Sequence, residues 1–336
     1  MLGVAKLAPG LGHIDLVQRE PADVPAGCVR LAVRAAGICG TDLHIEAGEY
    51  PSVPPVTMGH EVCGTVVETG SGVDAAWDGA RVVSETYFST CGRCRHCRAG
   101  RPNLCPDRRS IGTHVDGAFA ESVVVPAHGL HRVPEALADA AAALCEPLAC
   151  VCQSLLDPPA IVPGDRVLVV GPGAIGLLAA QVAAAGGAEV EVRGTAQDGP
   201  RLSLARDLGC ATSVAGVDGL HDEAYDVTVD CSGAGPGIAD ALRAARRGGR
   251  HVQIGLAGKD LTVPFDLICF KELVVTAGFA STPTSWRRAL ALLGRGVIDL
   301  PRLVTEVVAL RDFRHAFDDT RAGAGVKYVL DPQARA

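Results

Sequence analysis

The feature that most constrains the fold is a glycine-rich turn between an apolar strand and an apolar helix. Residues 171–176 follow VLVV directly and precede LLAAQVAAA. In this setting the GxGxxG pattern predicts a dinucleotide-binding βαβ unit, in which the helix N-terminus offers free N–H groups to a pyrophosphate. The alternative is an ordinary βα turn. The predicted cofactor-binding loop consists of Gly171, Pro172, Gly173, Ala174, Ile175 and Gly176.

The two halves of the chain differ in their patterns of apolar and turn-forming residues. Up to about residue 130, short alternating segments such as GCVRLAVRAA and ESVVVP are separated by Gly/Pro-rich turns, which predicts a β-rich barrel or sandwich. Residues 135–156 are rich in Ala and Leu and predict a helix. From residue 156, strands alternate with helices, which predicts a parallel, doubly wound α/β sheet. The tail ends in a further strand, VKYVLD.

Composition excludes several classes of function. The length of 336 residues suits about two domains. A net charge of −7 argues against a nucleic-acid partner, because phosphate binding needs a basic surface. We find no run of about 18 apolar residues that would cross a membrane. The segment MLGVAKLAPG lacks the features of a secretory signal, so we expect a cytoplasmic protein.

Cysteine spacing predicts one metal site. The 13 cysteines are odd in number, which argues against a disulfide framework. Four of them have the spacing C-x2-C-x2-C-x7-C and can surround a tetrahedral structural zinc, which leaves no open position for catalysis. A ferredoxin-type iron–sulfur cluster is the alternative. The four predicted ligands are Cys91, Cys94, Cys97 and Cys105. We expect seven others to lie in the core: Cys28, Cys63, Cys145, Cys152, Cys210, Cys231 and Cys269.

A second set of candidate ligands is spread along the chain. Cys39 lies in GICGTDLH, His60 and Glu61 lie in GHE, and Glu146 lies in LCEPLAC. Cysteine, imidazole and carboxylate are all zinc ligands, and three of them with an open position form a catalytic site. Taken singly each residue is weak, because a lone cysteine is usually a small buried hydrophobe.

The end of the second strand of the βαβ unit bears on the choice of cofactor. An NAD site usually carries an acid there for the ribose hydroxyls, but the chain reads Arg193-Gly194-Thr195. A missing acid, a hydroxyl and nearby arginines suit the 2′-phosphate of NADP. Arg193 and Arg201 are the candidate phosphate partners, and the alternative is that both are surface charges.

The motifs occur in an order that resembles the zinc-containing medium-chain alcohol and polyol dehydrogenases, especially the sorbitol- and threonine-dehydrogenase-like branch. The matching segments are GICGTDLH, MGHEVCGTVVETG, CGRCRHC with NLC, CEPLA, GPGAIG, and the tail from FKELVV to GVKYVL. The resemblance implies a chaperonin-like β-barrel catalytic domain over residues 1–155, to which residues 282–336 return. A Rossmann domain would cover residues 156–281.

The resemblance also implies roles for single residues. Cys39, His60 and Glu61 would hold the catalytic zinc, and Glu146 would bind it directly or through water. Thr41 would relay the alcohol proton and His44 would accept it onward. Gly194 departs from the family, whose polyol branch commonly has an acid there. The later strand ends would line the nicotinamide: Ser232, Gly233, Ile254, Gly255 and Leu256.

The predicted function is therefore hydride transfer between a secondary alcohol or polyol, or the matching ketone, and NAD(P), with a small preference for NADP. We expect two zinc ions per chain and a homodimer or homotetramer. One alternative is a zinc-independent quinone or enone reductase of the same superfamily. A non-enzymatic, cofactor-binding structural protein is the other. The metal-ligand sets argue against both.

Overall fold

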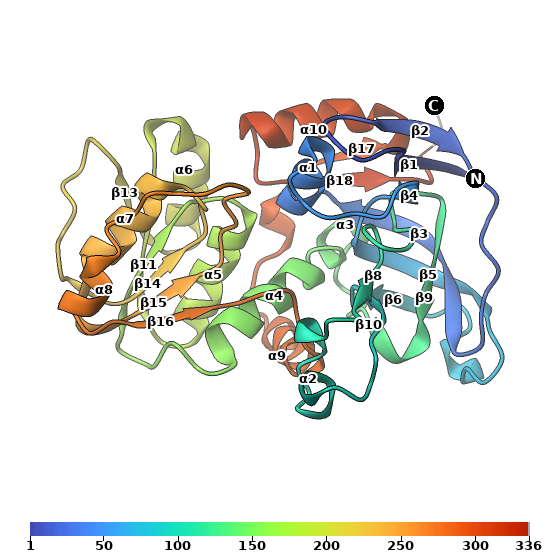
Figure 1. Ribbon diagram of the computed structural model, residues 1–336, viewed down its shortest axis with the longest axis horizontal. Coiled ribbons are helices and arrows are strands. Elements are labelled where there is room, and N and C mark those ends of the chain that lie inside the picture. Colours follow the sequence, from blue (N-terminus) through green and yellow to red (C-terminus); the bar gives the residue numbers. More distant parts are fainter. Residues whose placement is uncertain (335–336) are drawn as a thin grey trace. The chain divides into compact units, whose positions relative to one another are not determined.

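The chain folds into two compact units, and the computed structural model describes residues 1–334 (Figure 1). The first unit comprises residues 1–146 and the chain from Leu300 onward, and the second comprises Pro147–Asp299. The predicted boundaries were 155 and 282, whereas α4 (Cys145–Leu156), apart from its first two residues, and α9 (Pro283–Gly294) fall in the second unit. The guanidinium of Arg288 on α9 donates to the carbonyl of Leu156 at the end of α4.

The first unit is built from β-sheet. Its largest sheet has the strand order β10-β6-β5-β3-β18-β17, with β9 also paired to β3, and a smaller sheet has the order β2-β1-β4. The strands are β1 (Leu2–Lys6), β2 (Ile14–Gln18), β3 (Cys28–Gly37), β4 (Val56–Thr57), β5 (Glu61–Thr69), β6 (Arg81–Ser84), β7 (Tyr87–Ser89), β8 (Arg109–Ser110), β9 (Ser122–Pro126), β10 (Leu130–Arg132), β17 (Val304–Ala309) and β18 (Lys327–Asp331). Its helices are α1 (Gly40–Ala47), α2 (Arg95–Arg98), α3 (Asp139–Ala142) and α10 (Phe313–Ala322).

The C-terminal segment completes the core of this first unit. Strand β3 pairs antiparallel with β5, β9 and β18, and its apolar side chains are buried. On α10, Phe313 and Phe317 meet edge to face with ring centroids 5.8 Å apart, and Phe317 also meets Phe119 at 6.1 Å. The tail therefore returns to the β-rich unit, although it does so later in the chain than the predicted residue 282.

The second unit is a doubly wound α/β sheet, as predicted. All its strands are parallel, in the order β13-β12-β11-β14-β15-β16. Successive strands are added on one side of β11 up to β13 and on its other side from β14 onward, so the strand order reverses between β11 and β14. Ligands bind at such a switch point in open α/β sheets. The strands are β11 (Arg166–Val170), β12 (Glu189–Gly194), β13 (Ala211–Val214), β14 (Tyr225–Asp230), β15 (Ala245–Gln253) and β16 (Val274–Ala277). The further helices are α5 (Ala174–Ala185), α6 (Gly199–Asp207), α7 (Gly235–Ala244) and α8 (Asp266–Phe270).

The predicted helix over residues 135–156 is broken into α3 and α4. Contrary to the sequence-based expectation, the run Asp139–Leu156 is long and apolar enough to cross a membrane by length and composition. Of this run, 78% is buried inside the molecule, as in a core helix of a globular protein.

Candidate active site and metal centres

Antiparallel pairing of β3 with β5 assembles the predicted catalytic ligands. The register places Gly37 opposite Glu61, so Cys39, just beyond β3, comes beside His60, just before β5. The ligand atoms of Cys39, His60 and Glu61 all lie within 4.8 Å of one another. Two ordinary strand ends therefore bring together residues that are about 20 positions apart in the sequence.

Asp42 supports two of these ligands from the first turn of α1. Its Oδ2 accepts the backbone N–H of Cys39 at 2.9 Å, and its Oδ1 lies 3.7 Å from Nδ1 of His60. Within residues 1–334, this fully buried Oδ1 has no hydrogen-bond partner. Burial alone lowers the pKa of His60, but Asp42 and Cys39 raise it well above its usual value. A carboxylate beside Nδ1 orients the ring so that Nε2 is left for a metal.

Lys327 is a neighbour that the sequence analysis missed. Its buried ammonium donates to both carboxylate oxygens of Glu61, at 2.7 and 2.8 Å, and to the carbonyl of Ile38 at 2.9 Å. Burial lowers the pKa of Lys327, but Glu61 and then Cys39 raise it, and the net shift is upward. The carboxylate of Glu61 is thus shared between the metal cluster and a buried cation.

Glu146 lies near the cluster without joining it. The residue is buried at the start of α4, and its charge raises the pKa values of both His60 and Lys327. The compact group whose ligand atoms lie within 4.8 Å nevertheless contains Glu61 and not Glu146. In this arrangement Glu61 is the nearer carboxylate.

The two predicted relay residues lie on α1. Sγ of Cys39 donates to the hydroxyl oxygen of Thr41 at 3.7 Å, so Thr41 touches the ligand cluster. His44 is three residues further along the same helix, a spacing that puts two side chains on one face. Nδ1 of His44 lies 2.7 Å from Oε2 of Glu49.

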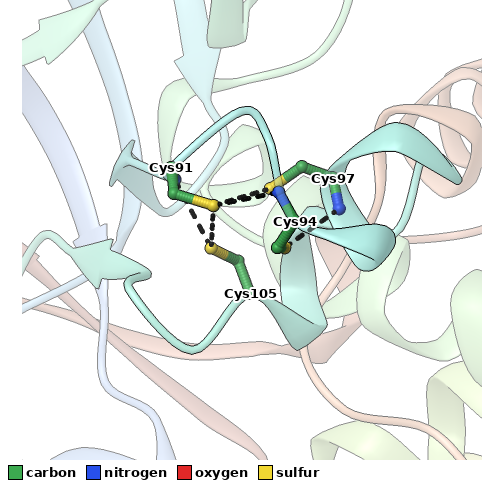
Figure 2. A group of neighbouring side chains, drawn as sticks. All are labelled: Cys91, Cys94, Cys97 and Cys105. Carbon is green, nitrogen blue, oxygen red and sulfur yellow. Dashed lines mark hydrogen bonds between the residues drawn. The ribbon is translucent and has the colours of Figure 1, made fainter.

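The four-cysteine segment forms a separate cluster of sulfur atoms, and Figure 2 shows the four side chains pointing toward one another. Sγ of Cys91 lies 3.6 Å from that of Cys105 and 4.0 Å from that of Cys97. Backbone N–H groups donate to the sulfurs, including that of Cys94 to Cys91 at 3.3 Å. Such N–H groups, from Arg93 and Cys94, lower the pKa of Cys91 to about 7, whereas burial raises that of Cys97 to about 11. The donor set and the sulfur separations suit a tetrahedral metal ion.

Backbone geometry explains the three glycines of the predicted cofactor loop. Gly171 has φ +96°, a conformation that side chains disfavour. A Cβ on Gly176 would lie 1.8 Å from the carbonyl oxygen of Gly171, so only glycine lets α5 approach the turn this closely. A Cβ on Gly173, the N-cap of α5, would meet no atom of the described chain within 4 Å. Gly173 therefore faces open space at the helix N-terminus.

The ends of β14 and β15 are packed against each other through Asp230. Its Oδ1 accepts the hydroxyl of Ser232 at 2.6 Å, and its Oδ2 accepts the N–H of Gly233 at 2.9 Å. The N–H groups of Ile254 and Gly255 both donate to the Asp230 carbonyl at 2.9 Å. A Cβ on Gly233 would lie 2.2 Å from the carbonyl oxygen of Leu256. The strand ends predicted to line the nicotinamide thus form one tight backbone assembly at the carboxyl edge of the sheet.

The end of β12 differs from the sequence-based expectation at Arg193. This side chain is buried, with hydrogen bonds to Asp240, Ser213 and the carbonyl of Asp218. Its donors hold the sheet together, so Arg193 is not a phosphate partner and the assignment is corrected.

The loop after Gly194 is organised by an acid that lies further along it. The N–H and hydroxyl of Thr195 both donate to Oδ2 of Asp198, at 2.9 and 2.8 Å. Arg201 pairs with Oδ1 of Asp198 at 3.3 Å. A Cβ on Gly194 would lie 3.0 Å from the ring of Pro172. Gly194 is therefore the residue of this strand end that lies against the glycine loop, whereas Thr195 and Arg201 are both bound to Asp198.

Comparison with known proteins places the chain in a family. An alcohol dehydrogenase GroES-like domain matches residues 25–135, and a zinc-binding dehydrogenase domain matches residues 174–295. A sorbitol dehydrogenase from Halalkalibacterium halodurans is 36% identical and covers 99% of each chain. The chain belongs to the zinc-binding alcohol dehydrogenase family. A D-arabitol-phosphate dehydrogenase from Enterococcus avium is 34% identical over 98% of this chain and 97% of its own.

A solved structure supports the same placement in the zinc-binding alcohol dehydrogenase family. A zinc-binding dehydrogenase from Sinorhizobium meliloti, bound to NADP, has a TM-score of 0.88 and 34% identity, and the match covers 98% of this chain and 99% of that one. The predicted combination of a chaperonin-like barrel with a Rossmann domain is confirmed. As a member of this family, the protein is an NAD(P)-dependent oxidoreductase that acts on an alcohol or polyol.

Three residues that shape the dehydrogenase site were not found by sequence reasoning. Lys327 had one signal, a lysine in the otherwise apolar strand segment VKYVL. Asp42 stands three residues after Cys39, the spacing of a helix N-terminal capping acid. Glu49 lies beyond the helix end, and its approach to His44 depends on the turn at Gly48. Sequence patterns carry no direct signal for such a contact.

Proposed function

We propose that this dehydrogenase oxidises a secondary hydroxyl of a polyol at a zinc held by Cys39, His60 and Glu61. The observation that carries the proposal is the convergence of these three ligand atoms within 4.8 Å, beside the hydroxyl of Thr41. A cysteine, a histidine and a carboxylate form a donor set typical of catalytic zinc. The buried Oδ1 of Asp42, close to Nδ1 of His60, is the outer partner that a metal-binding histidine usually has.

A second zinc is proposed at Cys91, Cys94, Cys97 and Cys105. The converging sulfurs and the backbone N–H groups that donate to them support it. Four thiolates fill the coordination shell, so this site is structural. The expected content is two zinc ions per chain.

The chain's own residues handle the alcohol proton. When zinc is bound, it acts as a Lewis acid that makes the substrate hydroxyl more acidic. Thr41 accepts the hydroxyl proton and passes its own to His44 on the same face of α1. A bound nicotinamide would supply the hydride acceptor, so that loss of the hydroxyl proton and of a hydride from the same carbinol carbon would balance the oxidation to a ketone. Lys327 holds the Glu61 carboxylate in place by two hydrogen bonds.

The glycine loop binds the cofactor's pyrophosphate. Gly173 leaves room for the anion at the N-terminus of α5, where free N–H groups and the helix dipole attract negative charge. Ser232, Gly233 and the segment from Ile254 to Leu256 are proposed to line the nicotinamide end, because they lie at the carboxyl edge of β14 and β15.

A preference for NADP over NAD is proposed from the end of β12. Gly194 itself contributes no carboxylate that would repel a 2′-phosphate, and the Asp198 carboxylate, whose Oδ2 lies 3.2 Å from the position of a Cβ on Gly194, is already held by Thr195 and Arg201. Rotation of Arg201 from Asp198 toward the phosphate would supply one charge-assisted contact. The NADP-bound relative from Sinorhizobium meliloti supports this choice. Comparing kcat/KM for NADP and NAD in the parent and in Arg201→Gln tests it, and an NAD preference in both would contradict it.

We propose that the protein is cytoplasmic and forms a homodimer through β16. The cysteines of the described chain form no disulfide with one another, which suits a reducing compartment. Strand β16 ends the strand order of the sheet, and its side chains Val274 and Val275 are 56% and 43% exposed. Exposed apolar edge strands pair with another strand, and a second copy offers a self-complementary one. Sedimentation of Val275→Lys should show monomers, and an unchanged assembly would contradict this interface.

A polyol panel tests the proposed reaction. Zinc-loaded protein is assayed with polyols, polyol phosphates, amino alcohols and simple secondary alcohols, each with NAD and NADP. We expect turnover of at least one polyol, and loss of that turnover in Cys39→Ser. Cys28→Ser, which alters a buried cysteine outside both ligand sets, is the matched control. Full activity in Cys39→Ser would contradict the proposed site.

A further inference from the structure

The exposed contact between His44 and Glu49 is expected to contribute little to folding stability. Nδ1 of His44 lies 2.7 Å from Oε2 of Glu49, and the two side chains are 27% and 45% exposed. Exposed ion pairs usually contribute little to folding. The same imidazole is the acceptor that the proposed reaction needs after Thr41.

The end of α1 is a turn that places Glu49 beside His44. Gly48 has φ +76°, and its N–H donates to the carbonyl of Ile45 at 3.1 Å, while the N–H of Glu49 donates to that of His44 at 2.9 Å. This pair of bonds is the Schellman motif, which folds the chain back over the last helical turn. The backbone of Glu49 is thus bonded to the same residue that its side chain contacts.

A buried lysine anchors this turn to the rest of the first unit. The ammonium of Lys6 donates to the carbonyls of Gly10, Gly12 and Glu46, and the N–H of Gly12 also donates to Glu46 at 2.8 Å. A Cβ on Gly48 would lie 2.8 Å from the backbone of Gly10, so the loop and the turn are in close contact. The position of Glu49 is therefore set by packed backbone.

The hydrogen-bonding chemistry then decides the tautomer of His44. An ionised carboxylate only accepts hydrogen bonds, so Nδ1 of the ring must carry the hydrogen that Glu49 accepts. In neutral His44 the lone pair is then left on Nε2. We propose that Glu49 is a positioning residue, which holds His44 in the tautomer whose Nε2 can receive the proton from Thr41. This inference rests on the proposed function, because it assigns His44 to the relay.

Glu49→Gln is the decisive variant, because an amide can donate to Nδ1 as well as accept from it, so the variant no longer restricts the hydrogen to Nδ1. In the zinc-loaded enzyme we expect kcat to fall by on the order of 10- to 100-fold with an unchanged KM for the alcohol. Nitrogen NMR of labelled histidine should show hydrogen on Nδ1 of His44 in the parent and a shift toward Nε2 in Glu49→Gln. Glu49→Asp keeps a carboxylate and should recover part of the turnover.

Glu46→Gln is the matched control, since this acid on α1 pairs with Arg321 and not with His44. It should leave kcat and the tautomer of His44 unchanged. Parent-like kcat in Glu49→Gln, or a slower variant whose His44 keeps hydrogen on Nδ1, would overturn the positioning role. His44→Ala separates the two ideas. If it turns over as fast as the parent, the relay itself is wrong, whereas a slow His44→Ala beside a fast Glu49→Gln rejects only the role of Glu49.

Discussion

Single residues outside the ligand set determine how well the proposed catalytic zinc is held. Asp42 accepts the N–H of Cys39 and faces Nδ1 of His60, so it orients two ligands at once. Changing Asp42 to Asn removes the charge that favours a hydrogen on Nδ1. We expect zinc affinity at this site to fall by on the order of 10- to 100-fold, as is typical for outer partners of a metal-binding histidine. Competition with a chromogenic chelator measures the change.

Asp74→Asn is the matched control for this prediction. Asp74 also caps a helical turn, by accepting the N–H of Ala76 at 2.9 Å, but it lies outside the metal clusters. Its zinc affinity should equal that of the parent. Equal affinities in the Asp42 and Asp74 variants would show that Asp42 does not support the metal.

His251 makes the second unit sensitive to acid. Burial lowers the pKa of this histidine, with partial opposition from Gln253 and Asp230. The unfolded chain therefore binds more protons than the native state between the lowered pKa and the unfolded value of about 6.5. The stability contributed by neutral His251 is present above that value and is lost as the pH falls through the folded pKa.

Urea unfolding between pH 7 and pH 5 tests the direction of this pH dependence of stability. The parent should lose more stability over the interval than His251→Gln, which keeps a polar side chain beside Thr228 without the titration. An identical loss of unfolding free energy in the two proteins would show that His251 does not cause the acid sensitivity.

The candidate ligands could be named because they stand in strings that resemble a known family, and the structure brings Cys39, His60 and Glu61 together. Lys327 could not, since its contact with Glu61 joins positions 266 residues apart and depends on strand register. Arg193 was misassigned for a related reason. It stands at the correct strand end, but its side chain donates hydrogen bonds to Asp240 and Ser213, and the local sequence does not indicate these contacts.

At the scale of elements, two glycines in the turn from β11 into α5 have different roles. Gly176 is needed for packing, and Gly173 leaves room for the cofactor. Gly176→Ala places a methyl 1.8 Å from the carbonyl oxygen of Gly171, so we expect a stability loss of about 1–3 kcal/mol. Gly173→Ala meets no described atom within 4 Å, so its free-enzyme stability should match that of the parent. Its methyl would instead crowd the pyrophosphate and weaken cofactor binding by about tenfold or more.

Thermal unfolding without cofactor and calorimetric titration with NADP measure the two effects. A stable Gly176→Ala would contradict the close packing of α5 against the turn. A Gly173→Ala that binds NADP as tightly as the parent would mean that the loop does not contact the cofactor as proposed.

The four-cysteine segment is an element whose order comes from its metal. Around α2 it has few buried apolar side chains, so the bound zinc supplies much of its folding free energy. Cys97→Ser should therefore unfold at a lower temperature, while the folded fraction keeps turning over substrate. Cys269→Ser should leave stability unchanged, because this cysteine is exposed. The sequence-based expectation that it lies in the core was wrong. Equal melting temperatures for both variants would contradict a structural metal.

For the whole molecule, periodicity and turn signals were enough to predict two architectures in the correct order. The doubly wound sheet follows from alternating strands and helices, and the β-rich unit follows from short alternating segments. The unit boundaries were less predictable. They depend on which unit α4 and α9 belong to, and the hydrogen bond from Arg288 to the carbonyl of Leu156 joins positions 132 residues apart.

The zinc content of the parent and of Cys39→Ser tests the central claim most directly. The account predicts two zinc ions per chain in the parent, and one zinc ion with no alcohol oxidation in Cys39→Ser, because the four-cysteine site is untouched. Elemental analysis of zinc-loaded, desalted protein gives both numbers. A parent with a single zinc ion that Cys39→Ser also retains would contradict a catalytic zinc at Cys39, His60 and Glu61.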